Sequence, residues 1–556
     1  MQVEIVGTGM NGEGVAKVDG KVVFVPMTLE GERVKVQITE DKKAFATAKV
    51  IKMLTPSPLR VAPLCPIYFG CGGCEMQHID YSHQLAIKTK RVADCIRKQC
   101  RQDIPVLPTI ASPIKWGYRN KVQLPITLVD GKIVVGYFRN GTHKVVPLGK
   151  AESDILGDCP LHDRAMQEVI DVFLDWANRN DLSVYDETTH CGLLRHFCVR
   201  RVGQSYAIVV VVNGNSLPNY TRLIDDFVAH GLSFSLYLSI NTERTNVIYG
   251  KSIKTLYGQE TLPCEILGVK ASVSPLSFMQ INDGVRDMIY SKVGEIISKS
   301  NHSVVFDLFS GVGIMSNIFA KYADKVVGIE IVPDAVRNAD TLAKLNGNQD
   351  KITNICGDVT VELPKQIAKY SGEKTSDSIV VLDPPRKGCS PEVIGCLLQA
   401  SPKQIIYVSC SPATLARDMA GLLSKYTVDF VQPYDMFPMT GHVETLVCLS
   451  KKTEKHINID VEFGEGEGQV SLKKLQEELN EQKPKKKTTY KDIQAYIEEK
   501  YGFKVHTAYI AEVKRDLGLP MYDAPNAVEE LKRPRSHPTA EMVEAIKDAL
   551  KHFEII

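Results

Sequence analysis

The stretch V-V-F-D-L-F-S-G-V-G at residues 304–313 decides the fold class, because it runs from an apolar strand into a glycine-containing turn. A helical pattern follows to about residue 322, and a second apolar run, K-V-V-G-I-E, occupies residues 325–330. Strand, helix and strand in this order predict a βαβ unit of a parallel sheet. We therefore predict an α/β, Rossmann-like domain over residues 276–452.

Acidic residues at the ends of these strands favour an adenosine-type cofactor. Glu330 lies 23 residues after Asp307, and in such a unit the turn glycines admit the cofactor while the acid accepts hydrogen bonds from ribose hydroxyls. The turn lacks the G-x-G-x-x-G pattern, which argues against NAD and favours S-adenosylmethionine. A further apolar run ends in D-P-P at 383–385. We expect Asp383 on a rigid loop at the reactive end of the cofactor.

Cys410 is the candidate nucleophile. It follows the apolar run I-I-Y-V-S at 405–409 and precedes Pro412, which cannot continue a sheet ladder. Because ligands of a doubly wound sheet bind beyond the carboxyl ends of the strands, a cysteine there can face a substrate. A buried structural cysteine is the alternative. Cys389 is the rival nucleophile, but it follows the D-P-P loop by several residues.

A second group of cysteines has the spacing of metal ligands. Cys65, Cys71 and Cys74 lie close together, and Gly72 and Gly73 allow the backbone to wrap around a metal centre. Zinc sites favour paired C-x-x-C arms, whereas three local cysteines with one distant cysteine suit an iron-sulfur cluster. A site closed by four thiolates has no open coordination position, so we expect a structural role.

The fourth ligand of this centre is open on sequence grounds. Cys159, in the segment D-C-P at 158–160, supplies a distant thiol, while Cys95 and Cys100 lie nearer along the chain and are rivals. The other cysteines are scattered singly, which argues against a disulfide framework and for reduced thiols.

Composition limits the remaining functions. The 556 residues carry a formal net charge of +1, so any nucleic-acid surface must be local. The N-terminal residues lack the pattern of a signal peptide, and we see no uncharged apolar run long enough to span a bilayer. We expect a cytoplasmic, monomeric protein that does not bind membranes.

The first 275 residues divide into three expected parts. Residues 1–56 alternate short β-like runs with glycine turns, which predicts a small OB-like β-barrel. Residues 57–90 contain the cysteine-rich loop, and residues 91–275 form a mixed α+β central domain. Basic and aromatic side chains of the central domain suit RNA binding by stacking and ion pairing, although a solvated surface accounts for them equally well. They are Trp116, Tyr118, Arg119, Lys121, Tyr137 and Arg139.

Two sets of motifs resemble known families. The residues N-G-E-G-V-A (11–16), V-F-V-P (23–26) and G-E (31–32) resemble the TRAM domain, whose families bind RNA; a barrel without a ligand is the alternative. Five further motifs together resemble the bacterial RNA uridine-C5 methyltransferases. They are S-F-M-Q-I-N (277–282), D-L-F-S-G-V-G (307–313), D-P-P-R-K-G (383–388), S-C-S-P-A-T-L-A-R-D (409–418) and H-V-E-T (442–445).

The resemblance covers residues 1 to about 452 and, with its barrel and cysteine cluster, points to the branch that modifies 23S ribosomal RNA. It implies that Gln280, Phe309, Glu330 and Asp383 contact S-adenosylmethionine. It also implies Cys410 as nucleophile, Glu444 as base, and a [4Fe-4S] cluster on Cys65, Cys71, Cys74 and Cys159. Two residues depart from the family pattern: Ile314 stands where some relatives have a polar cofactor-binding residue, and Ser310 stands where many have cysteine. Neither departure removes a catalytic group.

The chemistry requires these residue types. Carbon 5 of uracil is a weak nucleophile, so a thiolate must first add at carbon 6, and Cys410 fits that role. A base must then remove the proton from carbon 5, and Glu444, 34 residues further on, supplies a carboxylate. A stacked base reaches neither group, so the target uridine must be flipped out or unpaired.

The C-terminal part lies outside this resemblance. Residues 453–487 read as a charged linker with a helix near 471–482. Residues 488–556 predict three short helices that resemble a helix-turn-helix, with Lys514 and Arg515 exposed on the second; protein binding and nucleic-acid contact are equally expected.

The sequence thus predicts an S-adenosylmethionine-dependent enzyme that methylates carbon 5 of a uridine in 23S ribosomal RNA. A tRNA uridine methyltransferase is the alternative within the class. An iron-sulfur protein that binds RNA without catalysis is the alternative outside it.

Overall fold

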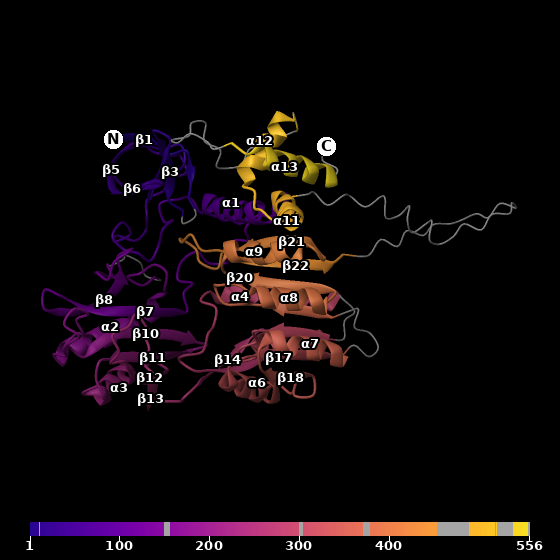
Figure 1. Ribbon diagram of the computed structural model, residues 1–556. Helices are drawn as coiled ribbons and strands as arrows, with labels where there is room; N and C mark the ends of the chain where they lie inside the picture. The colour runs from indigo at the N-terminus through magenta and orange to yellow at the C-terminus, as the bar shows by residue number, and fades with distance from the viewer. Residues whose placement is uncertain are drawn as a thin grey trace. The chain divides into compact units, whose positions relative to one another are not determined.

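The computed structural model describes residues 1–9, 12–149, 156–299, 304–370, 378–452, 489–517, 519 and 537–553. The chain divides into two units, Met1–Glu454 and Lys455–Ile556 (Figure 1). The expected linker at 453–487 and its helix near 471–482 lie outside the described residues. No helix among the described residues is long and apolar enough to cross a membrane.

The domain expected to carry the chemistry, residues 276–452, is called the catalytic domain below. It is built on a seven-stranded sheet, which confirms the predicted α/β class. Its strand order is β18-β17-β16-β19-β20-β22-β21. The first five strands in this order are parallel, and β22 runs antiparallel to both of its neighbours. The strands are β16 (Val304–Leu308), β17 (Lys325–Glu330), β18 (Ile352–Cys356), β19 (Ile379–Leu382), β20 (Gln404–Ser409), β21 (Tyr426–Tyr434) and β22 (Glu444–Lys451).

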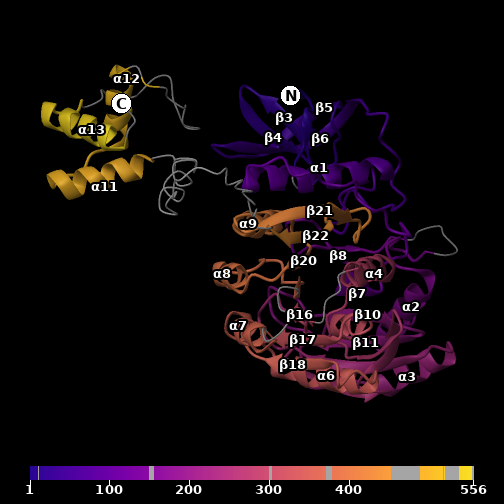
Figure 2. The same ribbon diagram turned by 90° about the vertical axis from the view of Figure 1, so that its right-hand side faces the viewer.

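Alternate residues of each strand pack on opposite faces, as expected for a sheet covered on both sides. Phe306 packs with α7, α8 and α9, whereas Val305 packs with α4 and α5. Figure 2 shows α7, α8 and α9 on one side of the sheet and α4 on the other. The strand order reverses between β16 and β19, and such a switch point opens a crevice beyond the strand ends. The helices are α4 (Asp283–Lys299), α5 (Ile314–Phe319), α6 (Pro333–Leu345), α7 (Val359–Tyr370), α8 (Pro391–Ala400) and α9 (Pro412–Leu422).

The N-terminal residues form the predicted barrel. Six strands pair in the order β1-β5-β6-β4-β3-β2. The chain passes from β1 to β2 through Ile5 and Val6, whose N–H groups donate to Glu32 and Val15, so the two edges of the sheet meet. The strands are β1 (Gln2–Glu4), β2 (Gly7–Thr8), β3 (Gly14–Val18), β4 (Lys21–Val25), β5 (Arg33–Asp41) and β6 (Phe45–Thr55).

The central part is a second seven-stranded sheet in the order β13-β12-β11-β10-β7-β8-β9, with α2 (Arg164–Arg179) and α3 (Tyr220–Ala229) packed on one face. A hairpin of β14 (Leu262–Ile266) and β15 (Val269–Val273) leads into the catalytic domain. The strands are β7 (Lys121–Val129), β8 (Lys132–Phe138), β9 (Val145–Pro147), β10 (Leu194–Val202), β11 (Ser205–Val212), β12 (Phe234–Ile240) and β13 (Ser252–Tyr257).

Helix α1 (Tyr81–Cys100) belongs to the core of the catalytic domain although it precedes that domain by almost 200 residues. Asp80 caps it, and Val92, Ile96 and Cys100 pack in the same apolar core as α9. The helix runs across residues 90 and 91, where we expected a domain boundary.

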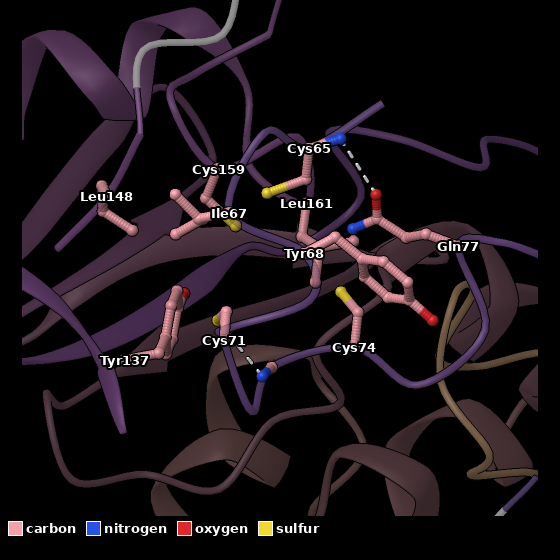
Figure 3. A pocket seen from close by; sticks show the side chains of 11 residues that line it. Cys65, Ile67, Tyr68, Cys71, Cys74, Gln77, Tyr137, Leu148, Cys159 and Leu161 are labelled. Atoms are coloured by element: carbon pink, nitrogen blue, oxygen red, sulfur yellow. Dashed lines mark hydrogen bonds between the residues drawn. The ribbon is translucent and has the colours of Figure 1, made fainter. Parts of the chain in front are cut away.

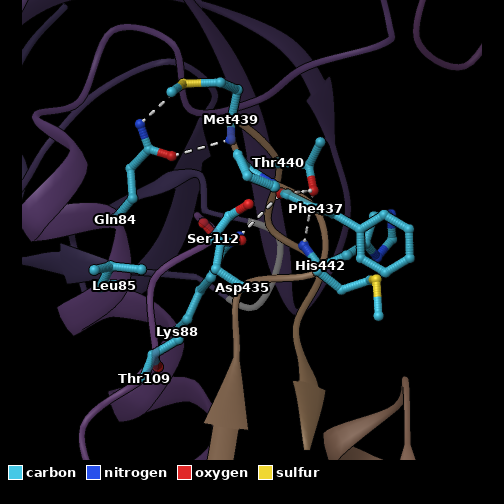
Figure 4. Close-up of polar contacts among 12 residues, drawn as sticks. Gln84, Leu85, Lys88, Thr109, Ser112, Asp435, Phe437, Met439, Thr440 and His442 are labelled. Carbon is cyan, nitrogen blue, oxygen red and sulfur yellow. Dashed lines mark hydrogen bonds and ion pairs between the residues drawn. The ribbon is translucent and has the colours of Figure 1, made fainter. Parts of the chain in front are cut away.

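A buried ion pair joins α1 to the loop between β21 and β22, residues 435–443. The Lys88 ammonium donates to the Asp435 carboxylate, and both side chains have 0% exposure (Figure 4). Lys88 also donates to the Phe437 carbonyl at 3.0 Å, and the Tyr81 hydroxyl donates to Asp435 at 2.8 Å. Each partner of the pair thus makes a further hydrogen bond besides the ion pair, which lowers the cost of burying two charges.

The C-terminal unit contains three helices, α11 (Tyr490–Tyr501), α12 (Thr507–Asp516) and α13 (Ala540–His552). Thr489 and Asp492 form a capping box at the start of α11, and Gly502 ends that helix with a φ of 75°. The three helices share one small apolar core. It consists of Ile493, Ile497, Val505, Ile510, Val513, Ala545, Ile546, Ala549 and Leu550.

We expect Lys88→Met to lower the free energy of unfolding by about 3–5 kcal/mol, because it leaves the Asp435 carboxylate buried without its cation. Urea denaturation followed by circular dichroism measures the change. The double variant Lys88→Met/Asp435→Leu should recover much of the loss, since no charge is then buried. Equal losses in the single and double variants would show that the ion pair does not hold this contact.

Candidate active site

Cys410 and Glu444 meet at the same end of two neighbouring strands. Cys410 directly follows β20, and Glu444 is the first residue of β22. The antiparallel register places Ser409 opposite Thr445, so the residue after Ser409 and the residue before Thr445 lie side by side. Glu444 is buried and Cys410 is half-buried.

The electrostatics of this pair favour proton transfer. Burial, reinforced by the nearby Asp383 charge, raises the pKa of Glu444 well above its ordinary value, and Arg386 opposes the shift. Among the described residues, Glu444 Oε2 has no hydrogen-bond partner. Burial and the Glu444 charge raise the pKa of the Cys410 thiol, and Arg386 again opposes them. The site therefore holds a proton-accepting carboxylate with a free oxygen beside a thiol.

The rival cysteine lies in a different environment. Cys389 is 3% exposed and packs in the apolar core under the sheet. The Tyr407 hydroxyl lies 3.6 Å from its sulfur, and burial raises the pKa of this thiol to about 11. A buried, apolar thiol is a poor nucleophile, so the geometry favours Cys410.

The residues expected to bind the cofactor lie at the carboxyl ends of β16, β17 and β19. Glu330 ends β17 and accepts hydrogen bonds from the N–H groups of Gly311 at 3.1 Å and Val332 at 2.9 Å. Phe309 follows β16 with a φ of 62°, and its N–H donates to the Ile329 carbonyl. These contacts fix the turn after β16 against the end of β17.

Asp307 and Asp383 line the switch point between β16 and β19. The pKa of each carboxyl is raised to about 7; burial is the main cause at both, and the nearby Asp383 charge contributes to the shift of Asp307. The Ser316 hydroxyl donates to Asp307 at 2.6 Å. Gln280 is buried, and its backbone carbonyl accepts a hydrogen bond from the Asn120 side chain of the central part at 2.9 Å.

Sequence reasoning missed the residues that hold the D-P-P-R-K-G loop. Asp418 of α9 is 2% exposed and accepts hydrogen bonds from the Cys389 N–H and the Tyr407 hydroxyl. Arg417 donates to Asp418 and to the carbonyls of Lys387 and Cys389. These two residues end the quoted motif S-C-S-P-A-T-L-A-R-D. Their polar character in a helix with an apolar face was the available signal.

The four cysteines expected to bind a cluster line one pocket. Figure 3 shows the sulfur atoms of Cys65, Cys71, Cys74 and Cys159 around it, together with apolar side chains. Burial raises the pKa of the Cys74 and Cys159 thiols, and the nearby Arg119 guanidinium opposes both shifts. The pocket thus offers four soft sulfur donors and a cation that offsets thiolate charge.

Among the described residues, no group of three or more His, Cys, Asp or Glu side chains is placed to hold a single metal ion. Cys95 and Cys100 do not line the pocket. Cys100 packs in the catalytic core instead, 3.5 Å from the Ala416 carbonyl.

Comparisons with known proteins agree with these assignments of fold. Residues 251–452 match the family model described as tRNA (Uracil-5-)-methyltransferase, and residues 1–51 match the TRAM domain. An uncharacterized RNA methyltransferase of Clostridium acetobutylicum is 36% identical over 455 residues, which are 80% of this chain and 95% of the relative. One of Caldanaerobacter subterraneus subsp. tengcongensis is 36% identical over 456 residues, 81% of this chain and 98% of the relative.

A solved structure shares most of the architecture. The crystal structure of Pyrococcus abyssi tRNA (uracil-54, C5)-methyltransferase in complex with S-adenosyl-L-homocysteine has a TM-score of 0.63 and 26% sequence identity. The match covers 81% of this chain and 100% of that chain. The barrel, central and catalytic parts therefore occur together in a related enzyme.

We expect Arg386→Gln to raise the pKa of the Cys410 thiol, because the variant removes the cation that opposes burial and the Glu444 charge. Alkylation of Cys410 by iodoacetamide, followed by peptide mass spectrometry across pH 7 to about 10, should shift to higher pH. Arg386→Lys keeps the charge and is the matched control. Identical profiles for wild type and Arg386→Gln would contradict the electrostatic role.

Proposed function

This chain belongs to the S-adenosylmethionine-dependent RNA uracil-C5 methyltransferases, and on that premise we propose that it methylates a uridine of 23S ribosomal RNA through Cys410. The observation that carries the proposed mechanism is the meeting of Cys410 and Glu444 at neighbouring strand ends. The choice of 23S ribosomal RNA rests on the resemblance, in which the TRAM barrel and the cysteine cluster occur together in the branch that modifies this RNA.

Cys410 begins the reaction as a thiolate that attacks carbon 6 of the uracil ring. The sulfur–carbon bond forms while the electrons of the carbon 5–carbon 6 double bond move toward the carbon 4 carbonyl. Carbon 5 thereby becomes nucleophilic. S-adenosylmethionine, when bound, supplies the methyl group from its sulfonium.

Glu444 completes the reaction by removing the proton from carbon 5. The electrons of that carbon–hydrogen bond restore the double bond, and the bond between Cys410 and carbon 6 breaks to release the thiolate. Burial raises the pKa of Glu444, which makes the ionised carboxylate a stronger base than an exposed glutamate. The buried site also excludes water that would compete for the proton.

Four residues are proposed to hold S-adenosylmethionine. Glu330, fixed by two backbone N–H groups, would accept hydrogen bonds from the ribose hydroxyls. Phe309, in the adjoining turn, would contact the adenosine. Asp383, beside Glu444 and Asp307, and Gln280 would contact the other end. The buried acids at this switch point favour a positively charged methyl donor.

A tRNA is the second candidate substrate. The P. abyssi relative is described as a tRNA (uracil-54, C5)-methyltransferase, so its architecture serves a tRNA substrate. The monomeric state, the cytoplasmic location and nucleic-acid contact by the C-terminal helices stay predictions from the sequence.

Covalent trapping separates the two substrates. With S-adenosylmethionine and 5-fluorouridine-substituted RNA, the wild-type protein should form a complex that survives denaturing gels, because fluorine on carbon 5 cannot leave as a proton. We expect the complex with a 23S ribosomal RNA fragment. Its absence in Cys410→Ala is the control for the nucleophile. A complex with tRNA alone would contradict the choice of ribosomal RNA.

We also propose a [4Fe-4S] cluster on Cys65, Cys71, Cys74 and Cys159. The support is the donor set: four buried or half-buried thiols around one pocket, with the Arg119 cation beside them. Such a cluster, closed by four thiolates, would hold together loops that are distant in sequence and has no open position for substrate.

Replacing Cys159 by serine should lower bound iron and sulfide and remove the visible absorbance of the purified protein, because a hydroxyl binds iron poorly compared with a thiolate. Cys95→Ser is the matched control, since Cys95 does not line the pocket. Iron and sulfide are measured by elemental analysis, and the absorbance by visible spectroscopy, on anaerobically purified samples of each variant. Zinc in place of iron, or iron retained in Cys159→Ser but lost in Cys95→Ser, would contradict this ligand set.

A further inference from the structure

The loop that carries the base rests on the cysteine-rich segment. Residues 435–443 connect β21 to β22 and lead directly into Glu444. The backbone N–H groups of Glu75 and Met76, which follow Cys74, donate to the Met439 carbonyl at 3.1 and 3.0 Å. The Glu75 side chain makes the third contact: its Oε2 accepts a hydrogen bond from the Gly441 N–H at 3.2 Å.

Apolar packing joins the same two segments. Met439 is 4% exposed and lies in one cluster with Cys65, Cys74 and Cys159. Its φ of 66° is a left-handed conformation that costs a residue other than glycine free energy. The contacts of Met439 must hold it there, and Gln84 adds two of them (Figure 4).

Helix α1 holds the same loop at its start and near its end. Lys88 binds Asp435 and Phe437, and the Arg91 guanidinium donates to the Gly441 carbonyl. Among the described residues, Glu75 is the side chain that accepts the Gly441 N–H. Both backbone groups of Gly441, three residues before Glu444, are thus hydrogen-bonded: Glu75 accepts from its N–H, and Arg91 donates to its carbonyl.

The position of Glu444 depends on the backbone that leads into it. Its Oε2 has no hydrogen-bond partner among the described residues, so no hydrogen bond to that oxygen corrects a shift of the backbone that carries it. Thr445 is fixed by the β20–β22 ladder, whereas the preceding residues are fixed by loop contacts. A displacement of about 1 Å at a catalytic group can cost about a hundredfold in rate.

We propose that Glu75 is a positioning residue for Glu444, which it holds by tying the 435–443 loop to the four-cysteine segment. The inference rests on the proposed role of Glu444 as base. Cys410 follows β20 and makes no use of this tie, so addition to carbon 6 proceeds without Glu75. Removal of the carbon 5 proton, and with it cleavage of the sulfur–carbon bond, requires it.

The loss of Glu75 therefore has a signature that general damage to the fold lacks. If the proton stays on carbon 5, the electrons for the double bond are not supplied and Cys410 cannot leave. The methylated RNA then stays bound to the protein even when its uridine is unsubstituted. A variant that is only less stable would form less adduct and release it normally.

The experiment follows this adduct over time with the full-length, iron-containing protein. Wild type and Glu75→Ala are mixed with S-adenosylmethionine and an unsubstituted 23S ribosomal RNA fragment, quenched, and run on denaturing gels. We expect adduct in Glu75→Ala to persist about ten- to a hundredfold longer than in wild type. Bound iron and visible absorbance, measured on the same samples, should match wild type.

Two matched variants separate the hydrogen bond from the charge. Glu75→Gln removes the charge but keeps an oxygen that accepts the Gly441 N–H, and it should restore the wild-type time course. Glu75→Asp keeps the charge but is one methylene shorter, and it should behave like Glu75→Ala. If Glu75→Ala fails to fold, the adduct lifetimes of Glu75→Asp and Glu75→Gln are compared instead, and a longer lifetime in Glu75→Asp supports the proposal.

Glu444→Gln is the reference that separates this inference from the proposed function. Persistent adduct in Glu444→Gln and in Glu75→Asp, with release in Glu75→Gln, supports both. Persistent adduct in Glu444→Gln alone overturns the role of Glu75 and leaves the base assignment intact. Normal release in Glu444→Gln overturns the base assignment itself, whatever Glu75 does.

Discussion

The buried ion pair between Lys88 and Asp435 is the constraint on which the arrangement of the active site depends. Both side chains are inaccessible to solvent, so neither charge can be left without its partner at a cost of less than several kcal/mol. The pair fixes α1 against the start of the 435–443 loop. The cysteine-rich segment fixes the middle of the same loop through Met439. Glu444 stands at its end.

The carboxyl groups at the active site lower the stability of the folded protein when they are ionised. Burial raises the pKa of Asp307 and Asp383 to about 7, above the ordinary value of about 4. A carboxyl with a raised folded-state pKa favours the folded state when protonated. Its cost is therefore absent below about pH 4, grows as the pH rises, and is complete above about pH 7. A site that binds a cationic methyl donor accepts this loss of stability.

The fold class and the position of Cys410 could be predicted from the sequence because the signals for both are local. The strand at 304–308 and its glycine turn predicted the α/β class, and Cys410 could be placed at a strand end from the apolar run before it and from Pro412. That Cys410 and Glu444 meet depends on β22 inserting between β20 and β21. No periodicity specifies that order, so Glu444 came from the family resemblance.

Long-range packing was beyond the sequence for the same reason. Nothing local in residues 81–100 indicates that α1 packs on α9, and the boundary expected at residues 90 and 91 falls inside this helix. Cys159 could not be chosen over Cys95 and Cys100 by spacing, whereas the fold brings Cys159 alone of the three to the pocket. The role of Glu75 depends on a loop more than 360 residues away.

The covalent bond to Cys410 is the central claim, and mapping its site tests it most directly. The complex trapped with 5-fluorouridine RNA is digested with trypsin and nuclease and analysed by mass spectrometry. Cys410 and Cys389 fall in different tryptic peptides, residues 404–417 and 388–403. We expect the methylated nucleotide on Cys410, in the peptide of residues 404–417. A nucleotide on Cys389, or on any other residue, would contradict it.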